Sequence, residues 1–568
     1  MKASDYIATF LAEQGITDAF GIPGGVILEL LYAMDRTVGI TPHLCYHEQG
    51  AAFAASGYGQ CGLVPGVAFA TCGPGILNTL TPVADAYADS TPMLVFTAHT
   101  HPKQAGQKGE VRFFHNQEIE LEPIFSAVTK ACMRVDALGE LASGISAAYT
   151  TAVTGRKGPV VVDILSGLLT QELPTLQIEM AATSTVAAVE NRRIAADIAH
   201  RIAMSKRPVL LLGEWIKLSD VVTQVIAFAE KNQIPVVSSR YAQDIMPQSA
   251  LYFGYIGTHG IRAANFIFSK ADLIVALGNR LAFPVDSASF RPLVEHTTVV
   301  RVDIDAAEFE RQIPGTINYC ADLADLMPAL LDQSSVGRDR SSWLAVCARL
   351  RSELAASDVT EPVKYIAEIL CGIRPETVVT SDVGNNEMWL SRGYQLADVR
   401  NRILYSKTFG TLGCSLPKAI GAQYAHRAPV ICFTGDQGLQ MNLQELQTVA
   451  SNRLPILITV LNNHSSGMIR EHEEARYGTH YLLTTPDTGY AALDIEKIAH
   501  VYGIPYQNWQ TLTKKQRVSI AIDIAGPMLL EVPLATEYSV TPHLKRGDPC
   551  QKLFPYLDEE LYRELDAL

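Results

Sequence analysis

Asp436 and Asn463 are two oxygen-bearing side chains whose types and spacing suit metal chemistry. Asp436 follows a glycine, Asn463 ends an Asn-Asn pair, and the two lie 27 positions apart. A carboxylate and an amide are hard oxygen donors, which Mg²⁺ accepts while it keeps other positions for phosphate oxygens and water. The pair therefore predicts a metal–diphosphate site. The competing interpretation is a turn aspartate and a loop asparagine in an ordinary α/β unit.

Strands are predicted immediately before both residues. The apolar run VICFT (430–434) leads to Asp436, and the run PILITVL (455–461) leads to Asn463. Between the two runs, residues 443–450 carry apolar side chains at helical spacing. Since parallel strands joined by a helix end at the same edge of a sheet, we expect the carboxylate and the amide to lie at one edge.

Glu48 is a second candidate, in the segment PHLCYHEQGAAFAASGYG. Taken alone, an acid ahead of an alanine-rich segment is explained by the helix dipole, which favours negative charge at a helix N-terminus. Downstream, a glycine turn at 71–75, Asn78 and an Asp-Ser-x-Pro turn at 89–92 precede an apolar strand. The small residues after Glu48 are expected to shield its carboxyl group from water, which suits a proton-sharing role.

Together these segments resemble the signature of thiamine-diphosphate (ThDP) enzymes, Gly-Asp-Gly followed by Asn-Asn, and the first domain of their acetolactate synthase-like members. The resemblance covers nearly the whole chain. It implies that Asp436, Asn463 and the backbone carbonyl of Ser465 hold Mg²⁺. It also implies that Glu48 hydrogen-bonds the aminopyrimidine of ThDP, so that the exocyclic amine can take the proton of the thiazolium carbon.

The resemblance extends to the loops that would hold the rest of ThDP. Gly410 would offer its carbonyl to the aminopyrimidine, and Leu412 would wedge between the two rings, a core leucine being the alternative. Gln437 departs from the family, which has glycine there. Gly438 follows it, so the backbone can still approach the phosphate. The other cofactor-binding residues that the resemblance implies are Asn78, Gly384, Asn385, Asn386, Gly435, Gly467 and Met468.

The substrate side departs further from acetolactate synthases. The arginine with which those enzymes grip the carboxylate of a second 2-oxoacid is Pro284 here, and proline cannot replace a bidentate arginine. Gln117 matches a glutamine of the family, and His115 and His472 add ionisable side chains for substrate handling. A loop histidine facing solvent is the alternative for His115. The residues that could compensate for the missing arginine are His472, Arg470 and Arg262.

The expected activity is therefore a ThDP- and Mg²⁺-dependent decarboxylation of a 2-oxoacid, with pyruvate as default donor, followed by carboligation. The expected acceptor is an aldehyde, a ketone, a sugar-derived carbonyl or a proton, so a classical acetolactate synthase is not expected. A lyase that cleaves a C–C bond is an alternative within the family. A catalytically silent nucleotide-binding or assembly protein is the non-enzymatic alternative, and the intact set of Glu48, Asp436 and Asn463 weighs against it.

Alternating strand and helix patterns predict an α/β fold of three doubly wound parallel-sheet domains. In the family these domains come in the order pyrimidine-binding, central and diphosphate-binding. The expected boundaries are 1–170, 188–332 and 358–545, with a tail at 546–568. Because the family places its cofactor between domains of different subunits, the resemblance implies a homodimer at minimum and a homotetramer as the expected assembly.

The central domain raises the question of a second cofactor. Acetolactate synthases bind FAD there at a Gly-Gly-Gly turn, which is Gly213-Glu214-Trp215 in this chain. A carboxylate and an indole oppose the close backbone approach that the flavin's phosphates need. From the sequence, retention of FAD and its loss both stay open.

Composition limits the remaining classes of protein. The chain has 568 residues, 48% hydrophobic and 18% charged, which is enough for several domains. A net charge of −13 without a basic run argues against a nucleic-acid partner. No apolar run reaches the roughly 20 residues that span a bilayer, the N-terminus lacks the apolar core of a signal peptide, and ten scattered cysteines are typical of reduced thiols. We expect a cytoplasmic protein whose partners are a 2-oxoacid and a carbonyl acceptor.

Overall fold

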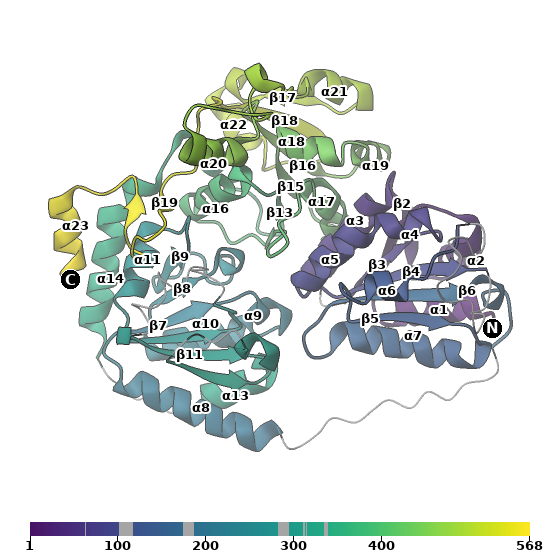
Figure 1. The fold of residues 1–568 in the computed structure, drawn as a ribbon, viewed down its shortest axis with the longest axis horizontal. Coiled ribbons are helices and arrows are strands. Elements are labelled where there is room, and N and C mark those ends of the chain that lie inside the picture. Colours follow the sequence, from purple (N-terminus) through teal and green to yellow (C-terminus); the bar gives the residue numbers. More distant parts are fainter. Residues whose placement is uncertain are drawn as a thin grey trace. The chain divides into compact units, whose positions relative to one another are not determined.

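Three six-stranded parallel sheets, each covered by helices, make up most of the chain (Figure 1). This architecture confirms the predicted α/β class with three doubly wound parallel sheets. The first and third sheets belong to one compact unit, and the second sheet belongs to another. The computed structural model describes residues 1–62, 64–100, 117–173, 187–281, 295–310, 313, 315–333 and 339–568.

The first sheet has the strand order β2-β1-β3-β4-β6-β5. Its central strand β4 is buried along its whole length, because helices cover both faces of a parallel sheet and leave no polar side. The strands are β1 (Asp18–Gly21), β2 (Thr41–Leu44), β3 (Gly66–Phe69), β4 (Met93–His99), β5 (Ala131–Val135) and β6 (Pro159–Leu165). The helices are α1 (Ala3–Glu13), α2 (Leu28–Arg36), α3 (Glu48–Cys61), α4 (Pro74–Asn78), α5 (Leu80–Ala88), α6 (Glu122–Phe125) and α7 (Leu138–Val153).

The third sheet has the order β14-β13-β15-β16-β18-β17 and contains the two predicted strands as β15 and β16. These two strands pair in parallel over Val430–Gly435. The helical segment predicted at 443–450 corresponds to α19, and α18, which was not predicted, precedes it. The strands are β13 (Val378–Ser381), β14 (Ile403–Leu404), β15 (Val430–Gly435), β16 (Ile456–Asn462), β17 (Tyr506–Asn508) and β18 (Met528–Pro533). The helices are α16 (Asn385–Ala397), α17 (Ser415–His426), α18 (Asp436–Met441), α19 (Glu445–Ser451), α20 (Gly467–Tyr477), α21 (Ile495–Tyr502) and α22 (Lys514–Ser519).

Helices α3 and α17 join the first and third sheets within their unit. Glycine permits this approach, because a Cβ atom on Gly421 would overlap the carbonyl oxygen of Ala54, and one on Gly57 would overlap the backbone of Lys418. Buried side chains of both helices and both sheets form one apolar cluster. The two sheets of this unit therefore share a core.

The second unit is built on a sheet of order β12-β11-β10-β7-β8-β9. The C-terminal tail packs in this unit, where Leu565 is fully buried and the ring of Tyr562 lies 5.8 Å from that of Phe266. Its parallel strands are β7 (Pro208–Leu212), β8 (Val236–Ser238), β9 (Tyr252–Tyr255), β10 (Leu273–Leu277), β11 (Thr298–Asp303) and β12 (Thr316–Cys320), and β19 (His543–Leu544) pairs with β20 (Leu553–Phe554). Its helices are α8 (Ala187–Met204), α9 (Trp215–Leu218), α10 (Val222–Asn232), α11 (Arg262–Ser269), α13 (Leu323–Asp332), α14 (Ser341–Leu354), α15 (Glu361–Leu370) and α23 (Glu559–Asp566).

The glycine contact between α3 and α17 can be tested with Gly421→Ala. The added methyl group would overlap Ala54, and overpacking of this kind costs about 1–3 kcal/mol, so the apparent Tm should fall. The matched control is Gly139→Ala in α7, where an added Cβ meets no atom within 4 Å. The control should keep or raise the Tm, since alanine favours a helix over glycine by about 1 kcal/mol. Equal Tm values for the two variants in differential scanning fluorimetry would contradict the contact.

Candidate functional site

Asp436 and Asn463 lie at the same edge of the third sheet, as predicted. Strands β15 and β16 are in register with Gly435 opposite Leu461, so the residues that follow these strands emerge together. Asp436 is the first residue of α18, and Asn463 follows the last residue of β16. Both side chains are buried, at 3% and 5% exposure. The parallel register thus brings a carboxylate and an amide to one buried edge.

Tyr490 contacts the buried carboxylate directly. Its hydroxyl group donates a hydrogen bond of 2.7 Å to Oδ2 of Asp436. Burial raises the pKa of Asp436, and this hydrogen bond partly offsets the increase. Tyr490 was missed in the sequence because no motif marks it and it lies in an irregular segment after α20.

Gly467 brings three segments of the site together. A Cβ atom on Gly467 would lie 2.7 Å from Nδ2 of Asn463 and 2.8 Å from Nδ2 of Asn385, so only glycine fits between the two amides. Gly467 is the first residue of α20 and Asn385 the first of α16. The beginnings of two helices of 11 and 13 residues therefore converge here, where the helix dipoles favour an anionic group.

The amide of Asn385 is only partly satisfied. Its Nδ2 donates to Oε1 of Glu471 at 2.7 Å, whereas its buried Oδ1 has no hydrogen-bond partner among the described residues. The neighbouring Asn386 turns its Nδ2 toward the backbone carbonyl of Asp382, at 3.0 Å. A buried amide oxygen without a partner is costly, and such a group marks a place where a polar ligand or an ordered water binds.

Asp382 organises the loops around this edge. Its Oδ1 accepts hydrogen bonds of 2.9 Å from the backbone N–H groups of Val383 and Gly413, and its Oδ2 accepts one of 3.3 Å from the hydroxyl of Thr434. An added Cβ on Gly438 would lie 2.9 Å from the same carboxylate. Burial raises the pKa of Asp382, and the donated hydrogen bonds oppose that increase. Its carboxylate joins three segments of the chain, around residues 382–383, 413 and 434–438. Sequence reasoning passed over it although it belongs to the motif TSDVGNN.

The segment with Gly410 and Leu412 approaches the same loops. Gly413 has φ +86°, and its carbonyl accepts a 2.8 Å hydrogen bond from Nδ2 of Asn442. Gly410 has φ +65° and is exposed, and Leu412 is partly exposed rather than a core residue. The anchored Gly413 thus leaves Gly410 and Leu412 at the surface of the chain.

Glu48 is the first residue of α3, as its sequence context predicted, and the ring of His47 caps that helix. Its Oε2 accepts a 2.9 Å hydrogen bond from Nδ2 of Asn78. The glycine turn lies beside it, since a Cβ on Gly75 would be 3.3 Å from its Oε1. The expectation that small neighbours shield the carboxyl group is wrong for the single chain: Glu48 is partly exposed, because the small residues of α3 pack inward against α17 and not over its first turn.

Glu445 of α19 fixes the turn that leads into Glu48. Its Oε1 accepts hydrogen bonds of 3.1 Å from the backbone N–H groups of Tyr46 and His47. A Cβ on Gly50 would overlap this side chain. Burial raises the pKa of Glu445, and the hydrogen bonds that its carboxylate accepts act in the opposite direction. The backbone immediately before Glu48 is therefore bound by α19, a helix packed on the third sheet.

Most of the remaining predicted site residues fall within the described part of the chain, and two fall outside it. Gln117 lies against the glycine turn, with its carbonyl in contact with Gly73, and has φ +60°. His472 is an exposed residue of α20. Ser465 is buried, and its hydroxyl donates to the carbonyl of Thr484 at 2.8 Å. At the beginnings of α18 and α20, three predicted residues are partly exposed: Gly435, Gln437 and Met468. Gly384 has φ +79°. His115 and Pro284 lie outside the described residues.

Arg262 and Arg470 do not present free guanidinium groups. Arg262 donates to the carbonyls of Leu553 at 2.8 Å and Pro555 at 2.5 Å. Arg470 donates to the carbonyls of Glu537 and Tyr538 at 3.3 and 3.4 Å. Both are almost fully buried. Neither arginine is therefore available to grip a substrate carboxylate.

The turn after β7, where the resemblance implied a flavin nucleotide, is filled by the chain itself. A Cβ on Gly213 would overlap the carbonyl of Gly278, and one on Gly278 would lie 2.7 Å from the Cβ of Trp215. The carboxylate of Glu214 lies 3.4 Å from Nζ of the buried Lys217. A phosphate group would meet this carboxylate and this indole, so the residues present do not fit FAD in that position.

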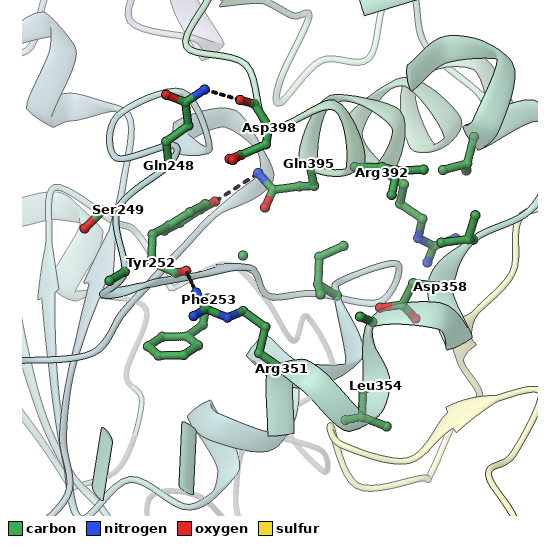
Figure 2. Close-up of a pocket in the computed structure, with 17 residues that line it drawn as sticks. Gln248, Ser249, Tyr252, Phe253, Arg351, Leu354, Asp358, Arg392, Gln395 and Asp398 are labelled. Atoms are coloured by element: carbon green, nitrogen blue, oxygen red, sulfur yellow. Dashed lines mark hydrogen bonds between the residues drawn. The ribbon is translucent and has the colours of Figure 1, made fainter. Parts of the chain in front are cut away.

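A separate cavity of about 490 Å³ lies in the second unit, beside β9 and the end of α14 (Figure 2). Met388–Arg400 also belongs to this unit, and the second half of α16 lines the cavity. The polar side chains in it bond to one another or to backbone: Gln395 donates to the hydroxyl of Tyr252 at 3.5 Å, and Arg351 donates to the carbonyl of the same tyrosine at 3.4 Å. None of the predicted site residues lines this cavity.

Among the described residues, no group of three or more His, Cys, Asp and Glu side chains is arranged to hold a metal ion. A metal at the third sheet would thus need amide and backbone oxygens beside the carboxylate of Asp436. None of the helices in the described part of the chain is long and apolar enough to cross a membrane.

Comparison with known proteins gives matches over all three sheets. Residues 1–119, 195–330 and 382–532 match the N-terminal TPP binding domain, the central domain and the C-terminal TPP binding domain of thiamine pyrophosphate enzymes. The chain is 32% identical to the acetolactate synthase large subunit of Lactococcus lactis, over 96% of this chain and 95% of that protein. It is 31% identical to the acetolactate synthase isozyme 2 large subunit of Escherichia coli, over 96% and 98% of the two chains.

Two buried acids at this edge should respond differently to amidation. In Asp382→Asn the new amide would face N–H and O–H donors, so we expect a lower apparent Tm, corresponding to about 1–3 kcal/mol. In Asp436→Asn the amide oxygen can still accept from Tyr490, and the buried charge is gone, so the Tm should stay or rise. Thermal unfolding of both variants without added cofactor at pH 7 checks this. Equal losses of Tm would contradict the organising role of Asp382.

Proposed function

Because the chain belongs to the thiamine pyrophosphate enzyme family, in its acetolactate synthase-like branch, we propose that it decarboxylates a 2-oxoacid and joins the remaining fragment to an acceptor carbonyl. Pyruvate is the proposed donor. The observation that carries the proposal is the convergence of Asp436, Asn463 and Asn385 at one buried edge, with Gly467 between the two amides. This edge combines hard oxygen donors with two helix beginnings, as a metal–diphosphate group requires.

The residues at that edge fit ThDP and Mg²⁺. Asp436, the amide oxygen of Asn463 and the backbone carbonyl of Ser465 would hold the metal. The beginnings of α16 and α20 would hold the diphosphate. Oδ1 of Asn385, which has no hydrogen-bond partner among the described residues, could accept a hydrogen bond from an ordered water there. When bound, ThDP supplies a nucleophilic carbon and an electron sink for decarboxylation.

Glu48 is proposed to hold a proton against the aminopyrimidine ring. Asn78 orients its carboxyl group, and the bond to Glu445 fixes the turn before it. Since this carboxyl group is partly exposed in a single chain, we propose that a second copy covers it and that the active form is at least a homodimer, with a tetramer as the larger assembly.

The acceptor is proposed to lack a carboxylate. Pro284 stands where the synthases have their gripping arginine, and the backbone carbonyls of the second unit and of residues 537–538 occupy Arg262 and Arg470. An aldehyde, a ketone or a sugar-derived carbonyl fits better than a second 2-oxoacid. Gln117, His115 and His472 are the proposed substrate-handling residues. Simple decarboxylation and C–C cleavage of a hydroxyketone are the second candidates, since both use the same cofactor site without a charged acceptor.

Two substitutions should separate cofactor activation from cofactor binding. Glu48→Gln should lower kcat at least 100-fold and leave the Kd of ThDP with Mg²⁺ unchanged, because only proton sharing is lost. Asp436→Asn should raise the Kd of ThDP at least tenfold at fixed Mg²⁺, and higher Mg²⁺ should recover part of it. Calorimetry and steady-state kinetics measure both, with Glu13→Gln on the exposed side of α1 as control. Full activity of Glu48→Gln would remove that residue from the mechanism.

The reaction itself is tested by pyruvate consumption with ThDP and Mg²⁺, with products identified by mass spectrometry. We expect a mixed hydroxyketone only when an aldehyde is added, because no described arginine candidate is free to hold a second 2-oxoacid. Acetolactate from pyruvate alone would contradict the proposed acceptor. An absence of consumption together with an absence of ThDP binding would contradict the enzyme proposal.

A further inference from the structure

The loop from Ser406 to Gly413 carries the two residues, Gly410 and Leu412, that are proposed to contact the cofactor rings. Its tip is open to solvent: Phe409 is 54% exposed and Gly410 is exposed as well. An exposed tip with φ +65° at Gly410 has little packing of its own. Its conformation must therefore be imposed at the two ends of the loop.

Two carboxylates of the first domain hold the start of this loop. Asp89, which ends helix α5, accepts hydrogen bonds of 2.8 Å from the backbone N–H groups of Lys407 and Thr408, one on each oxygen. Asp85, one helical turn earlier, accepts a hydrogen bond from the hydroxyl of Ser406. Both carboxylates are buried, at 6% and 0% exposure.

The end of the loop returns to the same carboxylate. The hydroxyl of Thr411 donates to Oδ1 of Asp85 at 3.1 Å, and the backbone N–H of Thr411 donates to Oγ of Ser406 at 2.8 Å. Ser406 and Thr411 therefore close the loop across its base, and Asp85 holds both. Two residues later, Gly413 is bound to Asp382.

Lys418 of α17 neutralises part of this buried charge. Its Nζ lies 2.9 Å from Oδ2 of Asp85 and donates to the carbonyl of Tyr405 at 2.9 Å. Burial by itself lowers the pKa of Lys418, but Asp85, Cys414 and Asp89 together outweigh burial, and the pKa is raised. Burying such a pair brings a large desolvation cost, and its best-attested benefit is conformational specificity.

We propose that Asp85 and Ser406 are positioning residues that preorganise the Ser406–Gly413 loop, so that Gly410 and Leu412 meet the aminopyrimidine and the thiazolium without reordering. This inference rests on the proposed function. In it, Asp85 of the first domain shapes the loop that contacts the cofactor in the same chain. It follows that cofactor affinity depends on hydrogen bonds with no direct contact to the cofactor, because a preorganised loop avoids the entropy cost of ordering.

Ser406→Ala tests the proposal without creating a buried charge. It removes the hydroxyl that donates to Asp85 and that accepts the hydrogen bond from the backbone N–H of Thr411. In the unliganded protein, the amide hydrogen of Thr411 should therefore exchange with solvent at least tenfold faster. The Kd of ThDP should rise about tenfold, as expected for one lost hydrogen bond at the base of a loop. Ser4→Ala is the matched control: Ser4 is fully buried in α1, and its hydroxyl has no hydrogen-bond partner among the described residues.

The possible outcomes separate a failure of the positioning role from a failure of the proposed function. Faster exchange at Thr411 with a raised Kd supports the proposal, and Thr411→Val, which removes the second hydroxyl donor to Asp85, should reproduce both effects. Unchanged exchange, or faster exchange with an unchanged Kd, overturns it. If the unaltered protein binds no ThDP in calorimetry, the proposed function and this positioning role both fail, whereas the exchange result still reports whether the loop is held.

Discussion

A single buried carboxylate, that of Asp382, determines how the loops of the third sheet meet. A carboxylate removed from water needs donors for both oxygens, and here they come from the backbone of Val383 and Gly413 and the hydroxyl of Thr434. Each donor belongs to a segment that the sheet delivers to its carboxyl edge. The requirement to satisfy one anion therefore fixes three chain segments relative to one another, and Gly438 is small enough to pass beside it.

The same principle operates at the contact between the first and third sheets. Asp85 and Asp89 are buried, and they are satisfied by a loop of the other domain and by Lys418. Close packing of α3 on α17, permitted by Gly421, places these groups within reach. The unit is thus held by an apolar core at its centre and by hydrogen-bonded carboxylates at the loops, and the exposed residues Gly410 and Leu412 depend on both.

The departures from acetolactate synthases concern the proposed recognition of the acceptor, whereas Asp436 and Asn463 of the proposed metal site are kept. Pro284 removes a guanidinium group, and the two arginines nearest in role, Arg262 and Arg470, are occupied by backbone carbonyls. In the second unit, Glu214 and Trp215 fill the turn that a nucleotide's phosphates would approach. These contacts agree with the proposed function, in which decarboxylation is kept and the acceptor carries no carboxylate.

The sequence alone determined the fold class, the strands β15 and β16 and the shared edge of Asp436 and Asn463, because hydrophobic periodicity and parallel-strand geometry are local or follow from a simple rule. It also placed Glu48 at the start of a helix. Only the tertiary structure revealed Asp382, Tyr490 and the loop contacts of Asp85, and only it showed that Glu48 is partly exposed. These contacts join residues tens to hundreds of positions apart, and which distant donor satisfies a buried carboxylate is decided by packing, for which a single sequence has no pattern.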